Sequence, residues 1–165
     1  MPDQKDQPKK EFTLVRMFDA PREVVFKAWT DEKLVQQWWG PNGVTNPVCE
    51  VDAKVGGLIN IVMLAGEELG PAKGMRWPMT GKFVELVEPE KIVFTAQAIN
   101  NDKPFLENIT TVTFEEEDGK TKMTVHTVVT KTYPEAGRML EQALAGMEAG
   151  WNQQSDKLVE FVKKM

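Results

Sequence analysis

Cys49 and His126 are the one pair of side chains in this 165-residue sequence that suggests catalysis by a thiol, since each is the single residue of its type. A thiol becomes a nucleophile when a base within hydrogen-bonding distance removes its proton. In the strand pattern Cys49 shares a face with Val51, which is typical of a small buried apolar side chain. His126 shares the face of Lys122 and Thr124, which we expect to point to solvent. The sequence therefore predicts structural roles for both residues.

Arg76 and Glu107 are the charged residues with the best prospect of contacting a ligand. Arg76 lies between Met75 and Trp77 in a segment rich in glycine and proline, and its guanidinium could bind a carboxylate or phosphate head group. The alternative is a solvated loop charge. Glu107 precedes a predicted strand at 108–116, and inside a pocket it would be an acid or base with a raised pKa.

Large apolar residues supply the remaining candidates for a binding site. Met75 and Trp77 lie in the predicted loop 66–78, where such residues are unexpected and could close the mouth of a pocket. Trp38 and Trp39 either pack in the core or form an aromatic pocket wall. Methionines, numerous for this length, fill irregular apolar space and suit adaptable binding surfaces. The candidate ligand-binding set is Trp38, Trp39, Met63, Met75, Arg76, Trp77, Met79, Glu107, Met123, Met147 and Trp151.

Composition restricts the class of protein. The net charge of −5 argues against a nucleic-acid partner, because a polyanion would be repelled. A lone cysteine forms no internal disulfide, which is typical of a reducing cytoplasm, and one cysteine with one histidine cannot form the usual structural zinc site. No stretch approaches the ~20 apolar residues of a membrane span, and residues 1–5 lack the apolar core of a secretory signal. We expect a cytoplasmic protein without metal, cofactor or membrane insertion.

The elements that must position these residues follow a simple order. Residues 1–10 are polar and predict a disordered tail, and 11–165 predict a single domain. A strand at 12–18, with both faces partly covered, precedes a helix that starts at Pro21 and a second short helix capped by Thr30. Further strands are predicted at 48–52, 58–64, 79–87, 91–98, 108–116 and 121–130, joined by turns at Gly56-Gly57, Glu88–Glu90 and Asp118-Gly119.

The end of the chain predicts one long amphipathic helix. Leu140, Leu144, Met147, Trp151, Leu158 and Val162 recur at helical spacing and form one apolar face. Gly146 and Gly150 lower helix propensity, so we expect a kink near residue 146. The order predicts an α+β fold in which the last helix covers one face of an antiparallel sheet. A strongly curved sheet around one helix tends to leave a cavity between them.

Several segments of the sequence resemble one family. They are residues 18–31, Trp38-Trp39-Gly40-Pro41, Glu50-Val51-Asp52 followed by Val55-Gly56-Gly57, residues 81–95, and Gly150-Trp151-Asn152-Gln153. Together they resemble the AHSA1-like (activator of Hsp90 ATPase homologue) proteins of the START/Bet v 1-like superfamily, over about residues 11–163. The resemblance implies a helix-grip fold and an internal pocket for a hydrophobic small molecule.

The resemblance does not imply one activity, and no catalytic motif carries over from it. The first hypothesis is a monomer or homodimer that binds a lipid, an isoprenoid or an aromatic molecule. The second is a cyclase- or hydrolase-like enzyme on a pocket-bound substrate, which needs a buried polar group for acid–base work. The third is a co-chaperone or interaction module that contacts an ATPase chaperone, suggested by the family name alone.

Overall fold

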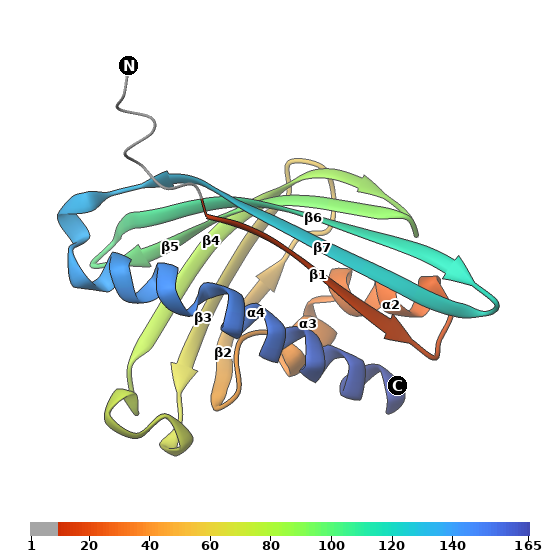
Figure 1. The fold of residues 1–165 in the computed structure, drawn as a ribbon, viewed down its shortest axis with the longest axis horizontal. Coiled ribbons are helices and arrows are strands. Elements are labelled where there is room, and N and C mark those ends of the chain that lie inside the picture. The colour runs from red at the N-terminus through yellow and green to blue at the C-terminus, as the bar shows by residue number, and fades with distance from the viewer. Residues whose placement is uncertain (1–9) are drawn as a thin grey trace.

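The computed structural model describes residues 10–165, so the predicted tail lies outside the described residues except for Lys10. The described chain forms one antiparallel sheet of seven strands in the order β1-β7-β6-β5-β4-β3-β2, crossed on one face by a long C-terminal helix (Figure 1). The strands are β1 (Glu11–Phe18), β2 (Val44–Val51), β3 (Leu58–Ala65), β4 (Arg76–Val87), β5 (Lys91–Asn100), β6 (Lys103–Glu117) and β7 (Lys120–Thr132). The helices are α2 (Arg22–Thr30), α3 (Glu32–Trp38) and α4 (Arg138–Lys163), with 3₁₀ turns η1 (Glu67–Ala72) and η2 (Pro134–Ala136).

The sheet is an open meander of six strands, and the first strand adds to it at one edge. Strands β2 to β7 each pair with their neighbour in sequence, whereas β1 pairs with β7, so α2 and α3 carry the chain from one edge of the sheet to the other. The predicted turn at Asp118-Gly119 is confirmed, with φ of 54° and 78° at the two residues. Two consecutive positive φ angles give the twist that a two-residue hairpin needs. The antiparallel sheet, the two short helices after β1 and the long C-terminal helix confirm the α+β helix-grip prediction.

Period-two alternation separates the two faces of the sheet. On β5, Ile92, Phe94 and Ala96 are buried on the inner face, which α4 crosses, whereas Thr95 and Gln97 lie on the outer face. The inner face and the three helices enclose a main core. A smaller cluster of Leu106, Val129 and Leu140 lies at the start of α4, and Met147 packs against both clusters.

Two helical expectations differ from the structure. Asp31, and not Thr30, caps α3, because the Asp31 carboxylate accepts a hydrogen bond from the backbone N–H of Lys33 at 3.0 Å. Helix α4 runs without a break through Gly146 and Gly150. Glycine costs roughly 1 kcal/mol in a helix interior. The apolar side chains of α4 that pack against the two core clusters, such as Leu144, Met147 and Trp151, offset that cost.

Two strand expectations also differ. Only one face of β1 is covered, since Val15 and Met17 are 46% and 49% exposed on the outer face. The predicted loop 66–78 is shorter, because η1 occupies its first half and β4 begins at Arg76. Strand β3 extends to Ala65, whose backbone N–H donates to the carbonyl of Met75 at 2.9 Å. This pairing makes Arg76 and Trp77 strand residues.

Candidate functional site

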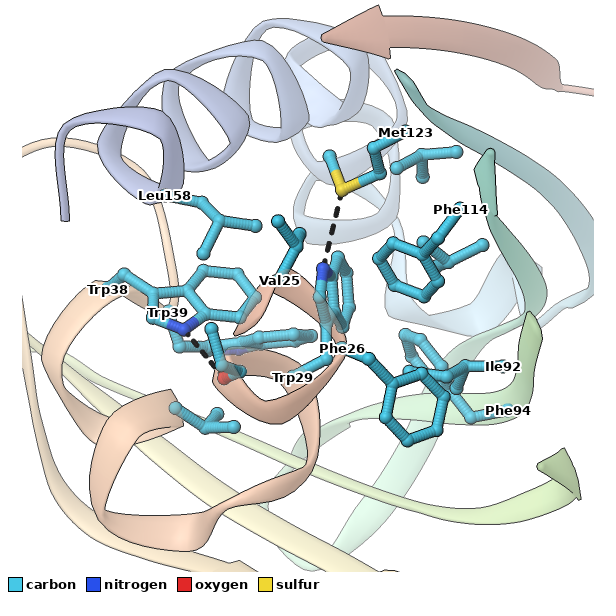
Figure 2. Close-up of a cluster of buried hydrophobic side chains, with 14 of the residues drawn as sticks. Val25, Phe26, Trp29, Trp38, Trp39, Ile92, Phe94, Phe114, Met123 and Leu158 are labelled. Carbon is cyan, nitrogen blue, oxygen red and sulfur yellow. Dashed lines mark hydrogen bonds between the residues drawn. The ribbon is translucent and has the colours of Figure 1, made fainter. Parts of the chain in front are cut away.

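An aromatic cluster fills the space between α2, α3, α4 and the sheet (Figure 2). Trp29 on α2 is its centre: the ring centroids of Trp38, Trp39, Phe94 and Trp151 lie 4.8, 6.2, 6.1 and 6.3 Å from that of Trp29. Trp39 and Trp151 also meet edge to face, with centroids 5.9 Å apart. Such geometry adds stabilisation beyond the burial of apolar area. The cluster joins elements that are far apart in the sequence.

The polar edges of two of these indoles are satisfied inside the protein. Trp38 Nε1 donates to the carbonyl of Ala28 at 3.0 Å, and Trp29 Nε1 points to the sulfur of Met123 at 3.4 Å (Figure 2). A buried N–H without a partner would be costly. Because both N–H groups have partners, the faces of these two rings present only apolar surface to their neighbours.

A small cavity lies beside this cluster, between α3 and the inner face of β2, β3, β4 and β5. Its volume is about 20 Å³, and its lining residues are Trp29, Val35, Trp39, Val51, Ile59, Ile61, Phe83 and Phe94. The space would admit one water molecule by size, but a buried water needs two to four polar partners. All eight lining side chains are apolar apart from the indole N–H groups. The cavity can take apolar groups and offers no acid or base.

Side chains of α4 and β2 hold the segment that carries Trp39. Gln154 Oε1 accepts from the backbone N–H of Gly40 at 2.7 Å, and Asn46 Nδ2 donates to the carbonyl of Trp39 at 3.0 Å. The Trp39–Gly40 peptide is therefore bound through both its polar atoms. Lys157 Nζ donates to the carbonyls of Gly40 and Pro41, each at 3.2 Å, and burial lowers the pKa of its ammonium group. The segment is fixed by side chains that sequence reasoning had not singled out.

A family model supplies the decisive comparison. The model described as "Activator of Hsp90 ATPase homolog 1-like protein" matches residues 19–163. The chain belongs to this family.

Solved structures of similar proteins agree with the fold of this AHSA1-like chain. A Chromobacterium violaceum protein is 27% identical, with a TM-score of 0.75 over 93% of this chain and 96% of that one. A Nitrosomonas europaea protein is 22% identical, with a TM-score of 0.73 over 94% and 95% of the two chains. The AHSA1 protein of Silicibacter pomeroyi is 23% identical, with a TM-score of 0.70 over 91% and 95%. No curated protein matches the chain.

Five predicted site residues of the AHSA1-like protein lie in or against its main core. Trp39 lines the cavity, Trp38 is buried beside it, and Trp151 is half-buried in the same aromatic cluster. Met79 and Met123 are buried core residues, 9% and 0% exposed. The structure therefore brings all three tryptophans together and gives the two methionines packing roles.

Three further candidates are half-buried toward the inner face. Met63 on β3 and Trp77 on β4 are cross-strand partners. Met63 also lies against Gly40, since a Cβ added at Gly40 would come within 2.8 Å of its sulfur. Met147 lies one helical turn before Trp151 on α4 and packs against both core clusters. Met63 and Met147 pack against the main core, and none of the three residues lines its cavity.

Met75 and the two charged candidates, Arg76 and Glu107, lie away from the cavity. Met75 and Arg76 are exposed where β4 begins. Glu107 is half-buried on the outer face of the sheet, where its carboxylate accepts a hydrogen bond from the Tyr133 hydroxyl. The internal cavity thus contains neither of the residues on which an acid–base mechanism in that cavity would depend.

Cys49 and His126 do not form a pair. They belong to β2 and β7, which are separated by the four strands β3 to β6. Burial raises the pKa of the Cys49 thiol to about 11, with a further contribution from the charges of Glu32 and Glu50. His126 Nε2 instead lies 2.6 Å from the carboxylate of Glu11 on the outer face. The predicted structural roles agree with this arrangement.

The sequence prediction missed most of the cavity wall. Of the eight lining residues only Trp39 was among the candidates; the others are Trp29, Val35, Val51, Ile59, Ile61, Phe83 and Phe94. Alternation around Asn60 marks Ile59 and Ile61 as inward-facing, but that signal is shared by every core strand. The candidate list favoured methionines, whereas the wall consists of valine, isoleucine, phenylalanine and tryptophan side chains.

Metal sites and membrane-spanning helices were also sought in the described part of the chain. Residues 10–165 contain no group of three or more His, Cys, Asp or Glu side chains that could hold a metal ion. Among the described helices, none is long and apolar enough to cross a membrane.

Proposed function

We propose that this AHSA1-like protein binds a hydrophobic small molecule, of the lipid, isoprenoid or aromatic class, between the inner face of its sheet and its helices. The observation that carries the proposal is the cavity between α3 and the sheet, because every residue that lines it is apolar. Empty apolar space costs the folded protein contacts that a ligand can restore. The match to the AHSA1-like family supports the same conclusion.

Binding requires the cavity to enlarge. Its volume of about 20 Å³ is far below the roughly 300–1,000 Å³ of ordinary ligand pockets. The half-buried side chains of Met63, Met147 and Trp151 pack against the main core and are the groups best placed to move. Methionine suits this role because it is unbranched and adapts its shape. We expect these residues to shift outward when the ligand enters.

The wall also restricts the chemistry of the ligand. A charged group transferred into this cavity would lose its hydration without gaining a counter-ion, which is strongly unfavourable. The part of the ligand that enters must therefore be uncharged and mostly apolar. Any charged head group must remain at the protein surface.

Fluorescence titration with fatty acids, isoprenoids and aromatic polyketides tests this proposal. Four tryptophans meet in the aromatic cluster and two of them line the cavity, so a ligand there should change the emission. Val51→Phe fills the cavity from its β2 side and should weaken binding at least roughly tenfold, because overpacking removes the space. Val48→Phe is the matched control on the opposite face of the same strand.

The stability of both variants must also be measured, so that a loss of binding can be distinguished from a loss of folding. Saturable binding that Val51→Phe weakens and Val48→Phe preserves would support the internal site. Absence of saturable binding to every class, or equal binding by both folded variants, would refute it.

A further inference from the structure

A second cavity lies on the outer face of the sheet. Helix α4 crosses the opposite face (Figure 1). It is a groove of about 490 Å³, within the range of small-molecule sites. Side chains of five strands form it: Leu58 from β3, Thr80 and Lys82 from β4, Thr95 and Gln97 from β5, Glu107 and Ile109 from β6, and Thr130 from β7. None of these residues lines the internal cavity.

The strand register places opposite charges at two positions in this groove. Lys82, Thr95 and Ile109 align across three strands, and Thr80, Gln97 and Glu107 form the next row. Lys82 and Glu107 are therefore two strands apart and one row apart. With strands ~4.8 Å apart and ~3.4 Å per residue, their Cα atoms are separated by roughly 12 Å. In the described residues neither side chain forms an ion pair.

Glu107 is held as a hydrogen-bond acceptor at its end of the groove. Its Oε2 accepts from the Tyr133 hydroxyl, and that hydrogen bond raises the pKa of Tyr133, so the tyrosine remains a donor. Lys131 Nζ lies 4.8 Å from the centre of the Tyr133 ring. No hydrogen bond to Glu107 Oε1 occurs within the part of the chain that the structure describes, which leaves this oxygen able to accept from a ligand.

The centre of the groove combines an amide with apolar surface. Thr80 Oγ1 donates to Gln97 Oε1 at 3.3 Å, so the Gln97 NH₂ group is left to donate elsewhere. Ile109 lies in the row of Lys82, two residues from Glu107 on β6. Leu58, 67% exposed, borders the groove beside Lys82. A cation, an amide donor, an apolar surface and an anion therefore follow one another across the groove.

We propose that this groove binds a short peptide of two or three residues with free termini. The peptide ammonium group contacts Glu107, a peptide carbonyl accepts from Gln97, and the terminal carboxylate contacts Lys82. An extended peptide spans about 3.3–3.6 Å per residue, so three residues cover about 10 Å. This length is close to the roughly 12 Å between the two Cα atoms, so the termini of the peptide lie over the two side chains when these project away from the sheet. One zwitterion of this length neutralises two charges that form no ion pair with each other in the described residues.

An NMR titration of the full-length ¹⁵N-labelled protein with trialanine tests the proposal. We expect saturable shifts of the amide signals of β4, β5 and β6 around the groove. Lys82→Gln and Glu107→Gln should each weaken binding roughly tenfold, as expected for loss of a charge-assisted contact. Lys122→Gln and Glu115→Gln, changed on the same outer face but outside the groove, should leave the affinity unchanged.

Capped trialanine, acetylated at one end and amidated at the other, supplies the decisive comparison. The proposal predicts that capping abolishes saturable binding. Equal binding of the capped peptide, shifts that acetate or ethylamine alone reproduces with equal affinity, or no shifts at millimolar trialanine would each overturn it. The amide spectrum of every variant also shows directly whether it has folded.

Discussion

Trp29 of α2 and Trp151 of α4 stack almost in parallel, with ring planes 17° apart and centroids separated by 6.3 Å. The contact joins two helices that lie at opposite ends of the sequence. Trp29 also lines the internal cavity, so α4 supports the cavity wall through this stack. The stability of the fold and the shape of the proposed site therefore depend on the same pair of rings.

Removal of the stacked ring should destabilise the protein. Trp151→Ala is expected to lower the free energy of unfolding by about 3 kcal/mol, since it removes a large side chain packed against the main core. Urea unfolding followed by circular dichroism measures this loss. Met17→Ala is the control, because Met17 is 49% exposed and should change stability by less than about 0.5 kcal/mol. Equal losses for the two variants would contradict the packing described here.

Two buried hydroxyl groups on the inner face of the sheet are expected to depend on each other as hydrogen-bond partners. Thr110 on β6 and Thr127 on β7 are fully buried, and their hydroxyls are 2.9 Å apart. Thr110→Val alone should cost about 1–2 kcal/mol, because the Thr127 hydroxyl loses its partner. The double change Thr110→Val/Thr127→Val should recover much of that loss, which a double-mutant cycle in urea would show as coupling. Strictly additive losses would mean that the two hydroxyls do not depend on each other.

Two glycines should respond in opposite ways to alanine. A Cβ at Gly81 on β4 would lie 2.0 Å from the backbone oxygen of Thr95, so Gly81→Ala should destabilise by about 3 kcal/mol. Nothing lies within 4 Å of a Cβ at Gly146, which is inside the continuous helix α4. Gly146→Ala should therefore stabilise by about 0.5–1 kcal/mol. Thermal unfolding of both variants measures the difference, and a destabilised Gly146→Ala protein would argue against an unbroken α4.

The Cys49 thiol should react slowly and only at high pH. Its pKa is raised from 9.0 to about 11, so below pH 9 its thiolate fraction is about a hundredfold lower than that of an ordinary cysteine. Iodoacetamide labelling of the native protein at pH 8 should be slower than labelling of the unfolded protein by that factor. The native rate should continue to rise up to pH 11.

The same shift has a defined effect on stability. The folded thiol holds its proton more tightly than the unfolded one, so its contribution to stability is fully present below pH 9.0 and is lost as the pH rises toward about 11. In the labelling experiment, a rate for the native protein that levels off near pH 9 would contradict the raised pKa of the Cys49 thiol and the burial that causes it.

Local signals were sufficient to predict the fold class. Alternation between polar and apolar residues, turn residues such as Asp118-Gly119 and the apolar stripe of α4 each specify an element through contacts close in sequence. Helix propensity alone was misleading at Gly146, where the packing of Leu144 and Met147 against the core outweighs the local preference. Val15 and Met17 were expected to be partly covered because they are apolar, yet β1 has an uncovered outer face.

The candidate site was less predictable because it depends on which strands become neighbours. Glu107 was considered as a pocket residue, but the register of β5 and β6 places it on the outer face beside Gln97. Its partner Tyr133 is 26 residues away in sequence. The contacts of Gln154 and Lys157 with the segment after Trp39 span more than 110 residues and have no sequence pattern of their own.

Native mass spectrometry of the protein, purified without detergent and incubated with the hydrophobic panel, tests the central claim most directly. The account predicts one discrete additional mass at 1:1 stoichiometry that is lost on denaturation, is retained by Val48→Phe and is absent from folded Val51→Phe. The bare protein mass under every condition, or the same adduct on Val51→Phe, would contradict an internal hydrophobic site.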